Sequence, residues 1–211
     1  DAEGEKLVRS PNLPSWVGPS IKKDLQKVLQ LPVVLENDVI FNAMGEAVHG
    51  AGKRYSIVGF VTISTGVNGA KIIDGQPDVG AFPYELGLLP IHGVSIESII
   101  SGRALAEVHG VPPETLPPTT WQSVERSLST ILLQMMLLWR PEVVIIAGPM
   151  VREKNIDLKR VTKLLATRWQ HPSPVPKLLA GTLEDHSGLY GALTYLDLHS
   201  EDIFGRVQKH S

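Results

Sequence analysis

The sequence contains no cysteine among its 211 residues. Disulfides, thiolate catalysis and cysteine-ligated zinc sites are therefore excluded. There is also no apolar run of the roughly 18–20 residues that a membrane-spanning helix requires, and the first residues, Asp1 to Lys6, are polar rather than signal-like. We therefore expect a cytoplasmic protein without a membrane partner.

The sequence has little excess of charge of either sign, because its formal net charge is −2. This balance gives no electrostatic reason to expect nucleic acid as the main partner. Hydrophobic residues make up 43% of the chain and charged residues 20%, which is typical of a globular protein. A chain of this length can build a hydrophobic core without disulfides.

Apolar patterning predicts alternating strands and helices, and hence an α/β fold. The expected helices are 20–30, 39–49, 95–108, 120–139, 157–170 and 187–198. The expected strands are 32–35, 55–63, 70–73, 143–147 and 178–180. Residues 55–75 are expected to form an antiparallel pair with a glycine-bearing bend, followed by a hairpin-type turn at Asp74-Gly75.

The first candidate site is Glu36-Asn37-Asp38, at a predicted strand-to-helix turn. A carboxylate there could accept a proton from a hydroxyl group, since ligands of open α/β sheets lie at the carboxyl ends of strands. Alternatively, Asn37 or Asp38 only caps the helix by satisfying a backbone N–H group. The spacing alone favours the capping role.

The second candidate is the turn Ser64-Thr65-Gly66-Val67-Asn68-Gly69. Hydroxyls and glycines in such a turn can present backbone N–H groups to a phosphate, because glycine lets a ligand approach the backbone closely. Asn68-Gly69 is equally a good sequence for an ordinary hairpin turn. The turn by itself leaves both interpretations open.

Two further candidates are a pair of carboxylates, Glu85 and Glu97, and a glycine, Gly148. Two carboxylates that converge on a polyol could orient it by accepting hydrogen bonds from its hydroxyls. Gly148 follows the buried strand 143–147 and would allow a flat ring such as adenine to approach the backbone. Surface glutamates and strand-to-loop glycines are common, so neither feature decides a function alone.

Taken in order, these segments resemble the motifs of the ROK family, which contains repressors, open reading frames and sugar kinases. Glu36-Asn37-Asp38 resembles the family's sugar-site motif, and the run Phe60 to Ala70 resembles its second phosphate motif, with a serine in place of the first glycine. Glu85-Leu86-Gly87 and the run Ser95 to Gly102 resemble its further sugar motifs. Val144 to Pro149 resembles its adenosine motif, and Gly188 to Ala192 its closing helix.

The resemblance implies a ribonuclease-H-like (actin-type ATPase and sugar kinase) C-terminal lobe with a short N-terminal remnant. Residues 1–36 would be the remnant and connecting strand, and residues 37–211 the lobe. The implied activity is ATP-dependent phosphorylation of a hexose hydroxyl, with Mg²⁺ on the phosphates.

Site roles also follow from the resemblance, one position at a time. Asp38 would be the general base, and the sugar hydroxyls would be held by Asn37, Glu85 and Glu97. The nucleotide phosphates would lie against Thr65 and Gly66, and Gly148 would lie near the adenosine.

The sequence departs from the family pattern in two places. Leu88 stands where the family's zinc-binding histidine falls and Ser95 where one of its cysteines falls, so we expect no zinc. The family's N-terminal Asp-x-Gly-Gly-Thr phosphate loop does not occur in the sequence.

Two alternatives to a kinase therefore stay open: a sugar-sensing domain, as in the family's repressors, and an inactive remnant. Because a lobe without its partner would expose apolar surface, we also expect a homodimer.

Overall fold

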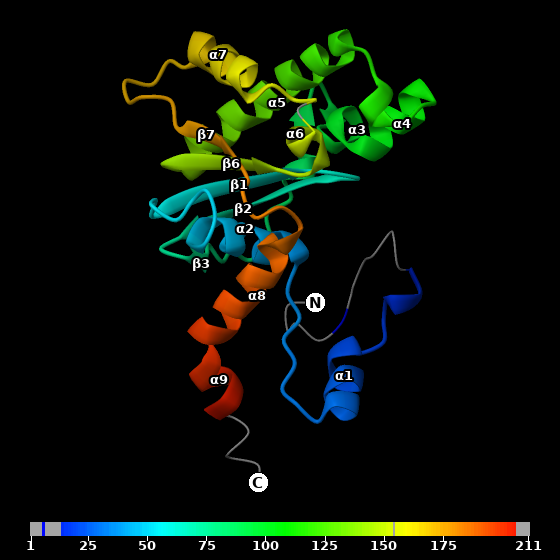
Figure 1. Cartoon of the computed structure of the whole chain (residues 1–211), viewed down its shortest axis with the longest axis vertical. Coiled ribbons are helices and arrows are strands. Elements are labelled where there is room, and N and C mark those ends of the chain that lie inside the picture. The colour runs from blue at the N-terminus through cyan, green and yellow to red at the C-terminus, as the bar shows by residue number, and fades with distance from the viewer. Residues whose placement is uncertain (1–5, 7–13, 154, 206–211) are drawn as a thin grey trace. The chain divides into compact units, whose positions relative to one another are not determined.

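The computed structural model describes residues 6, 14–153 and 155–205. The chain divides into two compact units. One unit is drawn from Asp1–Asp38 together with Tyr195–Ser211, and the other is Val39–Thr194. The larger unit contains the sheet and most of the helices (Figure 1).

The regular elements that the structure describes in the smaller unit are helices. Its elements are η1 (Pro14–Trp16), α1 (Ile21–Leu29), the end of α8 (Ser187–Leu198) and α9 (Ser200–Gly205). The expected helix at 20–30 is confirmed, and it ends at Gln30 in a left-handed conformation. The expected strand at 32–35 is wrong, since these residues have no regular structure. A strand needs a hydrogen-bonded neighbour, and in the described part of the chain no strand pairs with this segment.

The larger unit is built on a five-stranded sheet in the order β3-β2-β1-β6-β7. Its strands are β1 (Ile57–Ile63), β2 (Val67–Ile73), β3 (Gln76–Pro77), β6 (Val143–Ala147) and β7 (Lys177–Ala180). Strands β1, β6 and β7 are parallel, whereas β2 and β3 are antiparallel to their neighbours. The Asp74-Gly75 turn between β2 and β3 is confirmed, and both of its residues have positive φ.

The remaining elements of the larger unit are helices and one small hairpin. The helices are α2 (Asp38–Val48, of which Asp38 belongs to the smaller unit), α3 (Glu97–Ile100), α4 (Gly102–His109), α5 (Pro118–Trp139), α6 (Pro149–Arg152), α7 (Leu158–Arg168) and the first part of α8. Short 3-10 helices are η2 (Leu86–Leu88), η3 (Pro113–Thr115) and η4 (Glu184–His186), and the hairpin is β4 (Pro90–Ile91) with β5 (Val94–Ser95).

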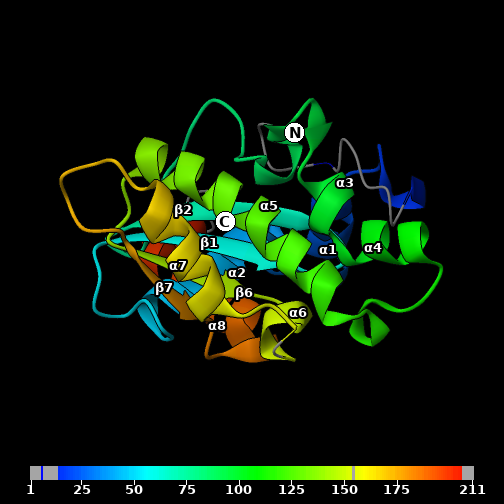
Figure 2. The ribbon, with the colours of Figure 1, turned by 90° about the horizontal axis from the view of Figure 1, so that it is seen from above.

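One face of the sheet packs against α5 and α7, which lie side by side over it (Figure 2). Along β1 the side chains alternate between faces, so Val61 and Ile63 join this core while Val58 and Phe60 do not. The long helix contributes buried residues along most of its length: Trp121, Val124, Leu128, Ile131, Leu132, Met135 and Met136. The expected apolar helix at 120–139 is therefore a core helix.

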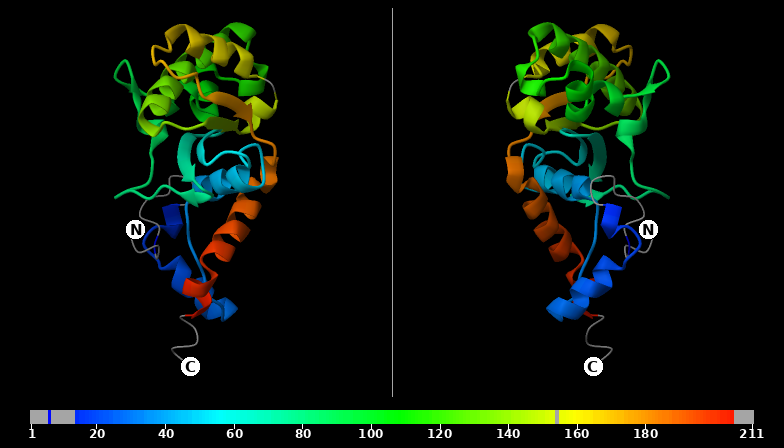
Figure 3. Two further views of the ribbon diagram at one scale, coloured as in Figure 1. Left: turned by 90° about the vertical axis from the view of Figure 1, so that its left-hand side faces the viewer. Right: turned by 90° about the vertical axis from the view of Figure 1, so that its right-hand side faces the viewer.

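The opposite face of the sheet is covered by α2 (Figure 3). The first part of α8 crosses α2 so closely that a Cβ atom on Gly191 would collide with the carbonyl group of Phe41, and one on Gly45 with that of Ser187. Small residues at these positions let the two backbones approach. The sheet is thus enclosed between two helical layers, and its carboxyl edge, where β1, β6 and β7 end, carries the candidate site.

Candidate functional site

The turn between β1 and β2 consists of Ser64, Thr65 and Gly66. It is closed by a hydrogen bond from the Ser64 N–H to the Gly66 carbonyl at 2.9 Å. The alternative turn at Asn68-Gly69 is wrong, because these residues lie in β2, where Asn68 pairs with Thr62. Thr65 is exposed. Within the described residues the backbone N–H groups of Thr65 and Gly66 have no hydrogen-bond partner.

The turn is held in place through its carbonyl groups. The Gly102 N–H donates to the Ser64 carbonyl at 2.8 Å, and the Arg103 N–H donates to the Thr65 carbonyl at 3.3 Å. Both donors belong to the first turn of α4, whose N–H groups have no partner within the helix. The carbonyl side of the turn is therefore fixed, whereas the N–H groups of Thr65 and Gly66 stay unpaired within the described residues.

These contacts also explain why the single helix expected at 95–108 is wrong. Ser101 is extended, with φ −69° and ψ 152°, and separates α3 from α4. Its hydroxyl accepts a hydrogen bond from the Ala104 N–H at 3.1 Å and caps α4. The break lets α4 begin beside the turn at 64–66.

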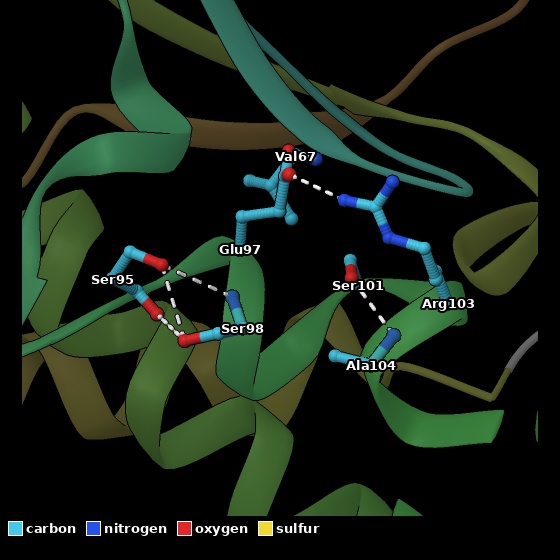
Figure 4. Close-up of polar contacts among 7 residues, drawn as sticks. All are labelled: Val67, Ser95, Glu97, Ser98, Ser101, Arg103 and Ala104. Atoms are coloured by element: carbon cyan, nitrogen blue, oxygen red, sulfur yellow. Dashed lines mark hydrogen bonds and ion pairs between the residues drawn. The ribbon is translucent and has the colours of Figure 1, made fainter. Parts of the chain in front are cut away.

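Glu97 lies next to this turn (Figure 4). Its Oε1 atom is 2.9 Å from Arg103 Nη2, and its Oε2 atom accepts a hydrogen bond from the Val67 N–H at 3.1 Å. A Cβ atom on Gly66 would lie 2.8 Å from the same Oε2 atom. The structure thus brings together Gly66 and Glu97, a predicted phosphate contact and a predicted sugar contact.

A pocket of about 290 Å³ adjoins Glu97 and Arg103. Hydroxyl groups line it, because Ser95 and Ser98 lie on the same side and bond to each other at 3.1 Å. The Glu97 side chain is 34% exposed. A partly exposed carboxylate beside hydroxyls and a guanidinium is suited to hydrogen bonding with a polyol.

Glu85 is exposed and directly precedes η2. The neighbouring Tyr84 hydroxyl donates to Asp78 at 2.8 Å, and burial, followed by this bond to Asp78, raises the pKa of Tyr84 to about 12. Lys71 lies 3.0 Å from Asp78, and its hydrogen bond, together with that from Tyr84, lowers the pKa of Asp78. This network anchors the segment that carries Glu85.

The segment after Glu85 leads toward Glu97. A Cβ atom on Gly87 would lie 3.2 Å from Glu97 Oε2 and would collide with the Val67 carbonyl. Glu85 therefore lies two positions before Gly87, which is a direct neighbour of Glu97. Among the described residues the two carboxylates are not in contact.

Gly148 lies at the end of β6, one position beyond the pairing of Ala147 with Thr62. Its φ of 107° is a conformation that side chains rarely adopt, and a Cβ atom there would collide with the Ile63 carbonyl. It also lines a groove of about 370 Å³ at the carboxyl ends of β6 and β7. Gly148 is thus adjacent to the strand end that enters the turn at 64–66.

Asn37 and Asp38 lie in the smaller unit, where Asp38 is the first residue of α2. Both are exposed, and the Asn37 N–H donates to Glu36 Oε1 at 2.7 Å. Their roles stay predictions.

The sequence analysis did not single out two charged residues near the candidate site, Arg103 and Glu46. Arg103 is six positions from Glu97, and only the break at Ser101 brings the two together. Glu46, in contrast, had a visible signal, because it is a charged residue on the apolar face of α2.

No helix of the described residues combines the length and apolar character needed to cross a bilayer. In the same part of the chain, no three His, Cys, Asp or Glu side chains are grouped as metal ligands.

The parallel strands, the antiparallel hairpin and the two helical layers define the actin-like ATPase fold, in its ribonuclease-H-like lobe. The model of the ROK family matches residues 2–197. The chain therefore belongs to the ROK family.

Relatives in the family differ in function. The chain is 30% identical over 175 residues to the uncharacterized protein CPE0188 of Clostridium perfringens, an alignment that covers 73% of this chain and 59% of that protein. It is 22% identical over 201 residues to a fructokinase of Zymomonas mobilis, covering 85% of this chain and 67% of that protein. It is 34% identical over 89 residues to the xylose repressor of Bacillus subtilis, covering 41% of this chain and 23% of the repressor.

Among solved structures, the chain is similar to a ROK family glucokinase from Streptomyces griseus, solved in complex with glucose and AMPPNP. The TM-score is 0.74 at 23% identity, over 91% of this chain and 76% of the glucokinase. At this identity the likeness shows the fold. The chain spans about three fifths of the length of its Clostridium relative.

Proposed function

We propose that the chain is the C-terminal part of a ROK sugar kinase that transfers a phosphoryl group from ATP to a hexose hydroxyl. The observation that carries the proposal is the turn at 64–66. It presents two adjacent unpaired backbone N–H groups and the Thr65 hydroxyl, and it lies beside Glu97. N–H groups of this kind bind phosphate oxygens.

In this proposal the residues divide into three groups. Thr65 and Gly66 contact the nucleotide phosphates, and Gly148 lies against the adenosine. The hexose hydroxyls are held by three side chains, namely Asn37, Glu85 and Glu97. Asp38 accepts the proton of the hydroxyl that is phosphorylated.

Mg²⁺ would enter with the nucleotide. This ion is commonly bound by one or two carboxylates and the substrate phosphates, and it keeps several waters. Glu97, whose Oε2 atom lies 2.8 Å from the position of a Cβ atom on Gly66, is a single carboxylate beside the turn at 64–66 and fits that mode. When bound, the ion would neutralise charge on the phosphates.

The proposal is tested by incubating the purified chain with Mg²⁺, ATP and a panel of hexoses, and by following the phosphorylated sugar. Product that requires both ATP and one hexose supports the proposal. Hexose binding without any product would instead favour the second candidate.

That second candidate is a sugar-sensing domain without catalysis. The observation in its favour is the 34% identity to the xylose repressor over a stretch of 89 residues, beside the 22% identity to the fructokinase over 201 residues. A domain of this kind needs the sugar contacts at Glu85 and Glu97 but has no need of a nucleotide. Binding of ATP to the chain therefore separates the two candidates, and a chain that binds neither ligand would be an inactive remnant.

Replacing Glu97 with glutamine is expected to weaken hexose binding by about 10–100-fold, because a hydrogen bond to a charged group is worth about 1.5–3 kcal/mol. Calorimetric titration of the variant measures this change. Glu107 is the matched control, since it lines the same pocket and is exposed. If Glu107→Gln weakened hexose binding as strongly as Glu97→Gln, the assigned contact would be wrong.

A further inference from the structure

A buried carboxylate, Glu46, forms part of the groove that contains Gly148. The groove lies between the carboxyl ends of β6 and β7 and is also lined by Arg152, Gly181 and Asp185. Glu46 reaches it from α2, on the helical layer below the sheet. Its side chain is 1% exposed.

Both oxygens of Glu46 accept hydrogen bonds from backbone N–H groups. Oε1 accepts from the Thr182 N–H at 2.7 Å and from the Leu183 N–H at 2.8 Å. Oε2 accepts from the Ala51 N–H at 3.0 Å and from the Thr182 hydroxyl at 3.4 Å. The carboxylate therefore joins the loop after β7 to the end of α2.

A buried carboxylate is costly unless hydrogen bonds compensate its charge. Among the described residues Glu46 forms no ion pair, so peptide N–H groups and one hydroxyl supply the compensation. Such bonds require defined positions of the donors. The position of the loop at 181–183 is thus tied to the position of one carboxylate.

The same loop lines the groove through Gly181, and Gly148 is also among the lining residues. A Cβ atom on Gly181 would lie 2.9 Å from Glu46 Oε1 and 3.2 Å from the Cβ atom of Ala147, so the loop is packed against both. Beyond it, Asp185 forms an ion pair with Arg152 of α6 at 2.8 Å, which connects the two walls. A shift of the loop would change the width of the groove.

We propose that Glu46 is a positioning residue that fixes the wall of the groove in the arrangement that accepts a nucleotide. This inference rests on the proposed function, because it takes the groove at Gly148 as the nucleotide site. Glu46 acts through the loop and does not itself touch the ligand, since its oxygens are occupied by the loop and by Ala51.

The test compares Glu46→Gln with Glu125→Gln. Glu125 is also 1% exposed, and it accepts a hydrogen bond from the Asp157 N–H at 2.9 Å, but it does not line the groove. In Glu46→Gln the amide keeps the size of the side chain but places an NH₂ donor group where one of the two acceptor oxygens was. We expect its affinity for AMPPNP with Mg²⁺, measured by calorimetry, to fall at least about tenfold. Glu125→Gln should stay within about twofold, because it disturbs the core elsewhere.

Amide hydrogen exchange gives a second readout that does not require a ligand. Glu46→Gln should exchange faster at Ala51, Thr182 and Leu183 while the strands of the sheet keep their protection. Gly181→Ala serves if Glu46→Gln does not fold, since it displaces the loop and leaves the carboxylate intact. It too should lose nucleotide affinity.

The outcomes separate the two claims. If the unchanged chain binds AMPPNP, and Glu46→Gln and Gly181→Ala bind it as tightly as the unchanged chain does, this inference is wrong and the proposed function stands. Unchanged exchange at Thr182 and Leu183 in Glu46→Gln also overturns the inference. A chain that binds no nucleotide overturns the proposed function, and the positioning role with it.

Discussion

Asp38→Asn is expected to lower the rate of hexose phosphorylation by about 10²–10⁴-fold, the usual contribution of a general base. The hexose hydroxyl must lose its proton as the phosphoryl group arrives, and an amide cannot accept that proton. Hexose affinity should change little, because the base acts mainly in the transition state. Steady-state kinetics together with calorimetry measures the two effects separately.

Asp24→Asn is the matched control, because Asp24 also lies in the first turn of a helix, α1. Loss of a carboxylate near a helix N-terminus costs about 0.3–1 kcal/mol of stability in either case. The midpoint temperature of thermal unfolding should therefore shift by a similar amount in both variants, whereas only Asp38→Asn should lose activity. Comparable activity of the two variants would remove Asp38 from the mechanism.

The second large effect is expected for Gly148→Ala. A side chain there must adopt a φ of 107° and would collide with the Ile63 carbonyl, at the point where β1 and β6 end together. We expect the free energy of unfolding to fall by about 2–4 kcal/mol, from backbone strain plus overpacking. The variant that remains folded should also bind the nucleotide more weakly, since the end of the strand at the turn must move.

Gly93→Ala separates the effect of positive φ from the effect of the collision on the free energy of unfolding. Gly93 has a φ of 83°, but a Cβ atom there would meet nothing within 4 Å. It therefore carries the strain of positive φ without the collision, and we expect a loss of only about 1–2 kcal/mol. Denaturant unfolding and AMPPNP titration of the two variants check this. If Gly93→Ala and Gly148→Ala lost equal amounts of stability and of AMPPNP affinity, the close approach of the backbones at Gly148 would have no special role.

The sequence predicted the elements that depend on local patterns. The β-branched runs became β1 and β6, because a strand buried on both faces leaves a short continuous apolar run, and the long apolar helix became α5. The apolar run at 32–35 had the same character and yet is not a strand, since strand formation depends on a partner that a local pattern cannot reveal.

The residue types of the candidate site could be predicted from the sequence, but the contacts between these residues could not. Glu97 and Gly66 could be singled out separately, while their contact depends on the fold of three segments. The Ser101 break arises from hydrogen bonds to Ser64 and Thr65, which lie more than thirty residues away along the chain. Helix propensity at 95–108 therefore could not indicate it.

The central claim is that this chain carries a hexose site beside a phosphate-binding turn. Calorimetric titration of the chain with a panel of hexoses tests it most directly. The account predicts saturable binding of one hexose per chain at millimolar affinity or better, which Glu97→Gln weakens and Glu107→Gln does not. Absence of binding to any hexose at millimolar concentration, in a chain whose thermal unfolding is cooperative, would contradict it.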